Sequence, residues 1–85
     1  MHDLVAAQDI IKAALATAKK NKLKTVDKVT VRLGTIVEHN QELSPENLLF
    51  NFNLVKKNTI AEKAKLAIKP GQGRELTITE VQGKK

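Results

Sequence analysis

The chain of 85 residues has no cysteine, no tryptophan and no tyrosine, and its two aromatic residues are Phe50 and Phe52. Without cysteine, the chain can form no disulfide, no thiolate zinc site and no cysteine nucleophile. Its two histidines, His2 and His39, give no plausible set of nucleophile, general base and orienting group. We therefore expect no catalytic residues and no enzyme activity.

Long apolar stretches are also missing. No run approaches the roughly 20 residues that span a bilayer. Asp3 and Asp9 stand where a secretory signal would carry positive charge. A chain of this length buries one modest core. The sequence thus predicts a single domain over residues 1–82, without a membrane partner, in the reducing cytoplasm.

Basic residues are in excess, with a net charge of +6 and a pI near 9.8. Such a charge invites a nucleic-acid partner, but proteins that bind single strands usually stack bases on aromatic side chains, and these are scarce here. Lys19, Lys20, Lys22 and Lys24 cluster at a predicted helix end, where cations complement the helix dipole. A solvated helix end is the favoured interpretation, although a docking surface for an acidic protein fits the same residues.

Two helices are predicted. Apolar residues recur at helical spacing over residues 3–20, with Asp3 as N-cap. The predicted inward residues of this helix are Leu4, Ala7, Ile11, Ala14, Leu15 and Ala18. A second helix is predicted from Ser44 to about Lys57, because Ser-Pro-Glu at 44–46 is a helix-start signal. Its predicted inward residues are Leu48, Phe52 and Val55, flanked by Leu49, and both phenylalanines are expected in the core.

Three strands are predicted from alternating residues at 28–33, 64–69 and 74–81. The Pro-Gly-Gln-Gly turn at 70–73 separates the last two strands, which we expect to pair as an antiparallel hairpin. The order α-β-α-β-β predicts an α+β fold, a three-stranded mixed sheet with two helices packed on one face. The first two strands would be joined by a parallel crossover. Residues 83–85 are expected to form a disordered tail.

The first three residues, Met1, His2 and Asp3, can chelate a metal ion. The α-amine of Met1, the main-chain nitrogens of His2 and Asp3 and a ring nitrogen of His2 can form a planar set of nitrogen donors. Such a set suits Ni(II) or Cu(II), whereas Zn(II) prefers tetrahedral sites. Binding requires the amides to lose protons and should therefore depend on pH. The alternative is a frayed, solvated N-terminus, which is the favoured interpretation when the tripeptide is taken alone.

Four strings follow one another along the chain: Met-His-Asp at 1–3, Val-Thr-Val-Arg-Leu-Gly at 29–34, the segment 44–64, and Gly-Arg-Glu-Leu at 73–76. In this order they resemble the HypA/HybF family of hydrogenase nickel-incorporation proteins. The resemblance covers nearly the whole chain. Its most specific strings are Thr-Ile-Ala-Glu at 59–62 and the string at 73–76, and neither encodes chemistry by itself.

The resemblance implies a nickel metallochaperone for [NiFe]-hydrogenase maturation, and sometimes for urease. Its partner would be a maturation-complex protein or the hydrogenase large subunit. It assigns the nickel site to Met1 and His2, with the amide of Asp3 completing the donors, and makes Ni(II) a transiently bound cargo. The family inserts a zinc domain with Cys-x-x-Cys-type ligands between its second and last strands. Here the short segment 69–73 stands in its place, so no structural zinc is expected.

The predicted polar loop at 35–43 carries further candidate ligands. His39 could be a second nickel or copper ligand, although a solvent-exposed loop histidine is favoured. An acidic residue of the family's corresponding loop has been linked to its nickel site. Because the loop here is longer than usual, neither Glu38 nor Glu42 can be matched to that residue. Thr35 also stands where the family usually has glutamate.

Three functions remain in competition. The first is nickel delivery by a HypA-like domain. The second is a metal-independent interaction module with the same fold, and the third, which the scarcity of aromatics disfavours, is a basic nucleic-acid-binding domain. The exposed edge of a three-stranded sheet would also allow a homodimer.

Overall fold

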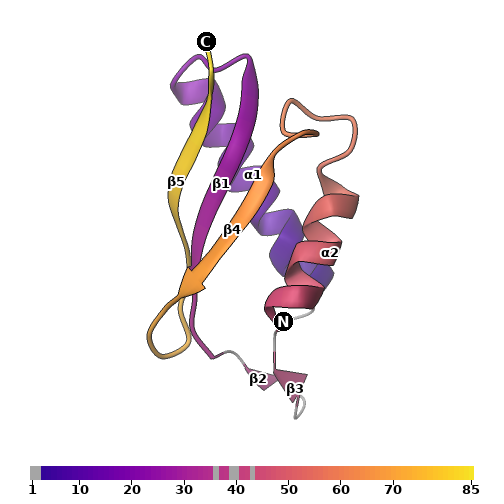
Figure 1. Ribbon diagram of the computed structural model, residues 1–85, viewed down its shortest axis with the longest axis vertical. Coiled ribbons are helices and arrows are strands. Elements are labelled where there is room, and N and C mark those ends of the chain that lie inside the picture. Colours follow the sequence, from indigo (N-terminus) through magenta and orange to yellow (C-terminus); the bar gives the residue numbers. More distant parts are fainter. Residues whose placement is uncertain (1–2, 36, 39–40, 43) are drawn as a thin grey trace.

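The computed structural model describes residues 3–35, 37–38, 41–42 and 44–85, which form a three-stranded sheet with two helices on one face (Figure 1). The elements are α1 (Asp3–Lys20), β1 (Thr25–Leu33), β2 (Val37–Glu38), β3 (Gln41–Glu42), α2 (Pro45–Val55), β4 (Lys65–Pro70) and β5 (Leu76–Lys84). The predicted α+β fold is confirmed. Inside the predicted polar loop, β2 and β3 form a small antiparallel pair that was not predicted. In these ranges, no helix has the length and apolar character needed to cross a membrane.

The central strand of the sheet is β1, which pairs with β4 in parallel and with β5 in antiparallel orientation. The parallel crossover through α2 is therefore confirmed, whereas the predicted hairpin between the last two strands is wrong. The reason lies in the apolar content of β1, which buries Val26, Val29, Val31 and Leu33. A strand with this pattern is best buried with neighbours on both edges, so β4 and β5 lie on opposite sides of it.

The segment 71–75 crosses the end of β1 to connect the two outer strands. The N–H of Gly34 donates to the carbonyl of Glu75, and the N–H of Thr35 donates to the carbonyl of Gly73, both at 2.8 Å. A Cβ atom at Gly34 would lie 2.2 Å from the carbonyl oxygen of Gly73. Glycine is thus required at Gly34 because another backbone passes directly over it.

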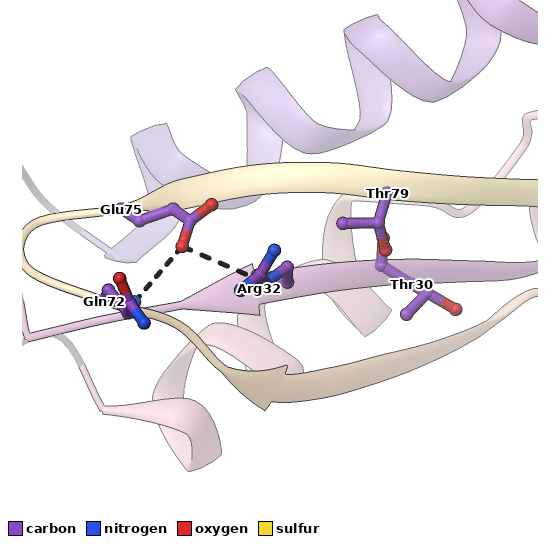
Figure 2. Close-up of polar contacts among 5 residues, drawn as sticks. All are labelled: Thr30, Arg32, Gln72, Glu75 and Thr79. Carbon is purple, nitrogen blue, oxygen red and sulfur yellow. Dashed lines mark hydrogen bonds and ion pairs between the residues drawn. The ribbon is translucent and has the colours of Figure 1, made fainter.

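Side chains reinforce the same crossing (Figure 2). The carboxylate of Glu75 accepts a hydrogen bond from the N–H of Gln72 at 3.2 Å, and its Oε2 atom lies 4.0 Å from Nε of Arg32. Because the two charged side chains are 47% and 26% exposed, this ion pair contributes little to stability. Its effect is to orient Arg32 at the end of β1.

The start of β1 is held by the segment between α2 and β4. Thr59 Oγ1 donates to the carbonyl of Lys56 at 2.6 Å and accepts from the N–H of Ala61 at 3.0 Å, which folds the segment into a tight turn. The carbonyl of Ile60 then accepts a hydrogen bond from the N–H of Val26 at 3.0 Å. Backbone hydrogen bonds therefore fix β1 at both of its ends.

The buried side of α1 includes Ala7, Ile11, Ala14 and Ala18, as predicted, and is wider than predicted because this helix contacts α2, β1 and β5. Its buried residues are Ala6, Ala7, Ile10, Ile11, Ala14 and Ala18. Leu15 is half-buried, but Leu4 is 44% exposed at the margin of this arc, so its predicted inward position is wrong. Asp3 is the first described residue of α1 and is itself helical, so its predicted role as N-cap is wrong.

The end of α1 is a left-handed turn. The N–H of Leu23 donates to the carbonyl of Ala18 at 2.9 Å, and Lys22 between them has φ of 60°. This is the bonding pattern of a Schellman C-cap, in which glycine is the usual left-handed residue. Lys19 and Lys20 lie in the last turn, as predicted.

The start of α2 agrees with its prediction. Ser44 is the N-cap, with its side chain accepting from the N–H of Asn47 at 3.1 Å, and Pro45 is the first helical residue. The capping hydroxyl satisfies one of the backbone donors that a helix start leaves unpaired. Local sequence alone was therefore sufficient to place the start of this helix, which ends at Val55 and not at about Lys57 as predicted.

The packing of α2 agrees in part. Leu48 and Phe52 are fully buried, as predicted, and Val55 is half-buried. Phe50 is 65% exposed, so its predicted place in the core is wrong. Two residues along a helix correspond to about 200° of rotation, which puts Phe50 on the side opposite to Phe52.

The last strand extends further than predicted. Gly83 pairs with Val26 and Lys84 with Thr25, and the N–H of Lys24 donates to the carbonyl of Lys84. The expected disordered tail is therefore wrong for Gly83 and Lys84. Both residues belong to the sheet because β1 begins at Thr25 and offers them a backbone partner.

Candidate functional site

The predicted nickel ligands lie at the start of α1. Met1 and His2 are outside the described residues, and Asp3 is the first residue of the helix, with its side chain outside the description. The first N–H groups of an α-helix have no acceptor within the helix. The amide of Asp3 is therefore not required by the helix ladder, so its nitrogen can serve as a metal donor without breaking a helical hydrogen bond.

The helix that follows the tripeptide is firmly packed. Ala6, Ala7 and Ile10 are 0–3% exposed in the first turns of α1, and α1 packs on α2, whose Leu48 and Phe52 are completely buried. The tripeptide is thus attached directly to a helix that the core holds in place. The N-terminal end of α1 lies toward the lower end of Figure 1, as does the β2–β3 pair.

The loop candidates are placed in part. Register pairs Glu38 with Gln41 and Val37 with Glu42, so the backbones of the two glutamates lie on neighbouring strands. Their side chains, and all of His39, lie outside the described residues. Among the residues that are described, no group of three or more His, Cys, Asp or Glu side chains is placed to hold a metal. The ligand roles of Met1, His2 and Asp3 stay predictions.

The structure also brings together side chains that the sequence reasoning missed. Lys28 stands in register with Lys65, and Arg32 with Lys69, on the neighbouring strands β1 and β4. No local pattern reveals this set, because the two members of each pair are 37 residues apart in sequence and meet only through the strand register. The alternation of the two strands does place each pair on the side away from the apolar residues.

Architecture and chain order define a small α+β domain that begins with a potential metal-chelating tripeptide followed by an amphipathic helix. A family model described as "Hydrogenase/urease nickel incorporation, metallochaperone, hypA" matches residues 1–75. The chain therefore belongs to the HypA family, and the resemblance noted from its strings is confirmed.

Two relatives show the extent of the similarity. Hydrogenase maturation factor HypA of Archaeoglobus fulgidus is 38% identical over 89 residues, which cover 95% of this chain and 77% of that protein. Hydrogenase maturation factor HypA of Caldanaerobacter subterraneus is 35% identical over 69 residues, covering 81% of this chain and 57% of that protein. The chain thus corresponds to a large part, and not the whole, of these proteins.

A solved structure supports the fold independently. The solution structure of the Ni metallochaperone HypA from Helicobacter pylori superposes with a TM-score of 0.71, covering 94% of this chain and 72% of that one. Sequence identity in this comparison is 16%. The likeness therefore shows a common fold, with helices and strands in the same arrangement.

Proposed function

We propose that this chain binds Ni(II) transiently at Met1, His2 and Asp3 and delivers it for the maturation of [NiFe]-hydrogenase. The observation that carries the proposal is the family match, which begins at Met1, the residue whose α-amine would be the first donor. The family description names nickel incorporation and metallochaperone activity. The tripeptide offers the donor chemistry that such a cargo needs.

The proposed site uses nitrogen donors only. The Met1 amine, the amides of His2 and Asp3 and one imidazole nitrogen would surround Ni(II) in a plane, a geometry that Ni(II) adopts readily. Because two amides must lose their protons, affinity should rise with pH. The start of α1 at Asp3 supports this arrangement, since the amide of Asp3 has no helical acceptor to give up.

The rest of the proposed role follows from the family. The partner that receives nickel would be a protein of the maturation complex or the hydrogenase large subunit, in the cytoplasm. We assign no catalytic step to the chain, because transfer of a bound ion requires none of its residues to act as nucleophile or base. We also propose that these 85 residues hold no structural zinc, since they contain no cysteine and zinc in structural sites is bound mostly by thiolates and imidazoles.

Isothermal titration calorimetry with Ni(II) on the untagged protein tests the site. We expect binding by the parent chain and loss of that binding in His2→Ala. His39→Ala is the matched control and should bind as the parent does. Absorption spectra at neutral to mildly alkaline pH should show the band of square-planar Ni(II). Equal binding by the parent and His2→Ala would remove His2 from the site, and absence of the band would favour the metal-independent interaction module.

A further inference from the structure

The face of the sheet that points away from the helices carries a second surface. Val29 and Val31 of β1 and Leu66 of β4 are buried toward α1 and α2. Since side chains alternate along a strand, the residues between them point to the opposite face. In Figure 1, α1 passes behind β1 and β4, and no element of the part of the chain that the structure describes covers this open face.

Four cations of the open face form a rectangle. Lys28 stands beside Lys65, and Arg32 beside Lys69, with about 4.8 Å between the strands. The two pairs are four residues apart along each strand, which corresponds to about 13 Å. We call this set of four side chains the basic face.

Folding stability does not explain the basic face. Like charges placed side by side on neighbouring strands destabilise a sheet. Arg32 is partly compensated by Glu75 (Figure 2). Lys28, Lys65 and Lys69 are exposed, and no salt bridge joins them to a carboxylate within the described ranges. An anion bound across the four cations would relieve this repulsion, which the fold itself does not.

The centre of the basic face, between β1 and β4, holds small side chains, and Glu80 of β5 stands opposite Thr30 on the other side of β1. Thr30 lies opposite Ala67 between the two cation pairs, and Thr30 is 5% exposed although no helix covers it. Thr79 of β5 donates from its hydroxyl to the carbonyl of Thr30 at 3.3 Å, and Figure 2 shows the two threonines on neighbouring strands. Small side chains at the centre allow an incoming chain to approach the sheet while its acidic groups reach the cations around it.

We propose that the basic face is a docking surface for an acidic segment of a partner protein. Carboxylates on that segment would meet Lys28, Lys65 and Lys69 directly, in the arrangement that charge complementarity favours. Nucleic acid fits less well, because no aromatic side chain is available for stacking on this face. The two aromatics of the chain, Phe50 and Phe52, both belong to α2 on the other side of the sheet. The surface is independent of the tripeptide and of nickel.

The test compares two basic surfaces of equal charge. A fluorescein-labelled hexaglutamate peptide is titrated with the parent chain, with the double variant Lys65→Gln/Lys69→Gln, and with Lys19→Gln/Lys20→Gln, which removes two exposed cations from the end of α1. We expect the first double variant to bind about fivefold more weakly, which corresponds to about 0.5 kcal/mol for each of the two exposed ion pairs that are lost. The second double variant should bind within about twofold of the parent, when both are measured at an ionic strength that screens the difference in net charge between them.

Amide shifts of the ¹⁵N-labelled parent chain provide a readout that needs no variant. Titration with the peptide should move the signals of β1 and β4 more than those of residues 19–24. Thermal unfolding serves as the folding control. Lys65→Gln/Lys69→Gln should be at least as stable as the parent, because each pair of neighbouring cations has lost one of its charges.

Three results would overturn the proposal. The first is an equal loss of peptide affinity in the two double variants, which would mean that only the net charge of the protein matters. The second is a set of shifts confined to residues 19–24. The third is tighter binding of a duplex or single-stranded oligonucleotide of equal charge, with the same dependence on Lys65 and Lys69, which would assign the face to nucleic acid. If the first double variant fails to fold, Lys28→Gln/Lys69→Gln replaces it.

Discussion

The strings most specific to the family and the tripeptide proposed to hold nickel are supported by the fold in different ways. The string at 59–62 anchors the start of β1 through the hydrogen bond from Val26 to Ile60, and the string at 73–76 anchors its end through Gly34. Each is held by backbone hydrogen bonds to a strand far away in sequence. The tripeptide at 1–3 instead shares Asp3 with α1, and all of its proposed donor atoms lie within three consecutive residues.

This difference shows that, in this small domain, the residues most specific to the family and the residues proposed to bind the metal are different ones. The strings by which the family is recognised build the scaffold, because a turn that passes over another backbone tolerates few residues. The proposed chelate needs only an amine, two amides and one imidazole, so its sequence demands are met by a single side chain, His2. Changes in the scaffold should therefore alter the free energy of unfolding, and changes in the tripeptide should alter nickel affinity.

The largest effect is expected in the core that holds α1. Phe52→Ala should lower the free energy of unfolding by about 3–5 kcal/mol, because it removes a fully buried aromatic ring. Phe50→Ala, two residues away on the exposed side of the same helix, should change it by less than about 0.5 kcal/mol. Urea unfolding followed by circular dichroism measures both. Similar losses in the two variants would contradict the burial described for α2.

A glycine pair tests the anchor at the end of β1. Gly34→Ala should cost about 2–4 kcal/mol, because its methyl group would displace the crossing segment and break the two hydrogen bonds made there. Gly73→Ala meets no atom within 4 Å and has only its φ of 57° to overcome, a cost of about 1 kcal/mol. Chemical denaturation of both variants gives the comparison, and a cost for Gly73→Ala equal to that for Gly34→Ala would indicate backbone strain in place of the close approach.

The sequence was sufficient where local physics decides. Ser44 and Pro45 specify the start of α2, and alternation in 28–33 specifies most of β1. The prediction from sequence failed where distant segments compete for one pairing partner. No local pattern specifies that β4 and β5 pair with β1 and not with each other. Phe50 was misplaced because apolar character alone does not set the side of a helix. For the candidate site, the sequence predicts which atoms would be the donors. The basic face was not predicted, because its residues meet only through a strand register that depends on the whole fold.

The turn at the start of β1 offers an intermediate effect. Thr59→Val keeps the shape of the side chain but removes the hydroxyl that bonds Lys56 and Ala61, and should cost about 1–2 kcal/mol. Thr79→Val is the matched control, since Thr79 is itself exposed and makes one longer, part-buried hydrogen bond, and it should cost at most about 0.5 kcal/mol. Thermal unfolding of the two variants separates these values. Equal stability would mean that the hydroxyl of Thr59 adds nothing to the anchor.

A smaller, opposite effect is expected at the end of α1. Lys22→Gly should raise the free energy of unfolding by about 0.5–1 kcal/mol, because Lys22 occupies the left-handed region that glycine enters without steric cost. Lys20→Gly, inside the helix, should lower it by up to about 1 kcal/mol. Both variants lose one cation, so the electrostatic contribution cancels in the comparison. A loss of stability in Lys22→Gly would show that its side chain matters more than its backbone.

The smallest effect on stability is expected from nickel itself. A ligand raises the melting temperature only when it binds the folded chain better than the unfolded one. The donors of Met1, His2 and Asp3 are all within one tripeptide and remain available after unfolding. Saturating Ni(II) should therefore leave the melting temperature unchanged while calorimetry still detects binding. A clear rise would mean that a residue brought close by the fold completes the site, and repeating the scan with Glu38→Gln, His39→Ala and Glu42→Gln would identify which one, because its variant alone would lose the rise.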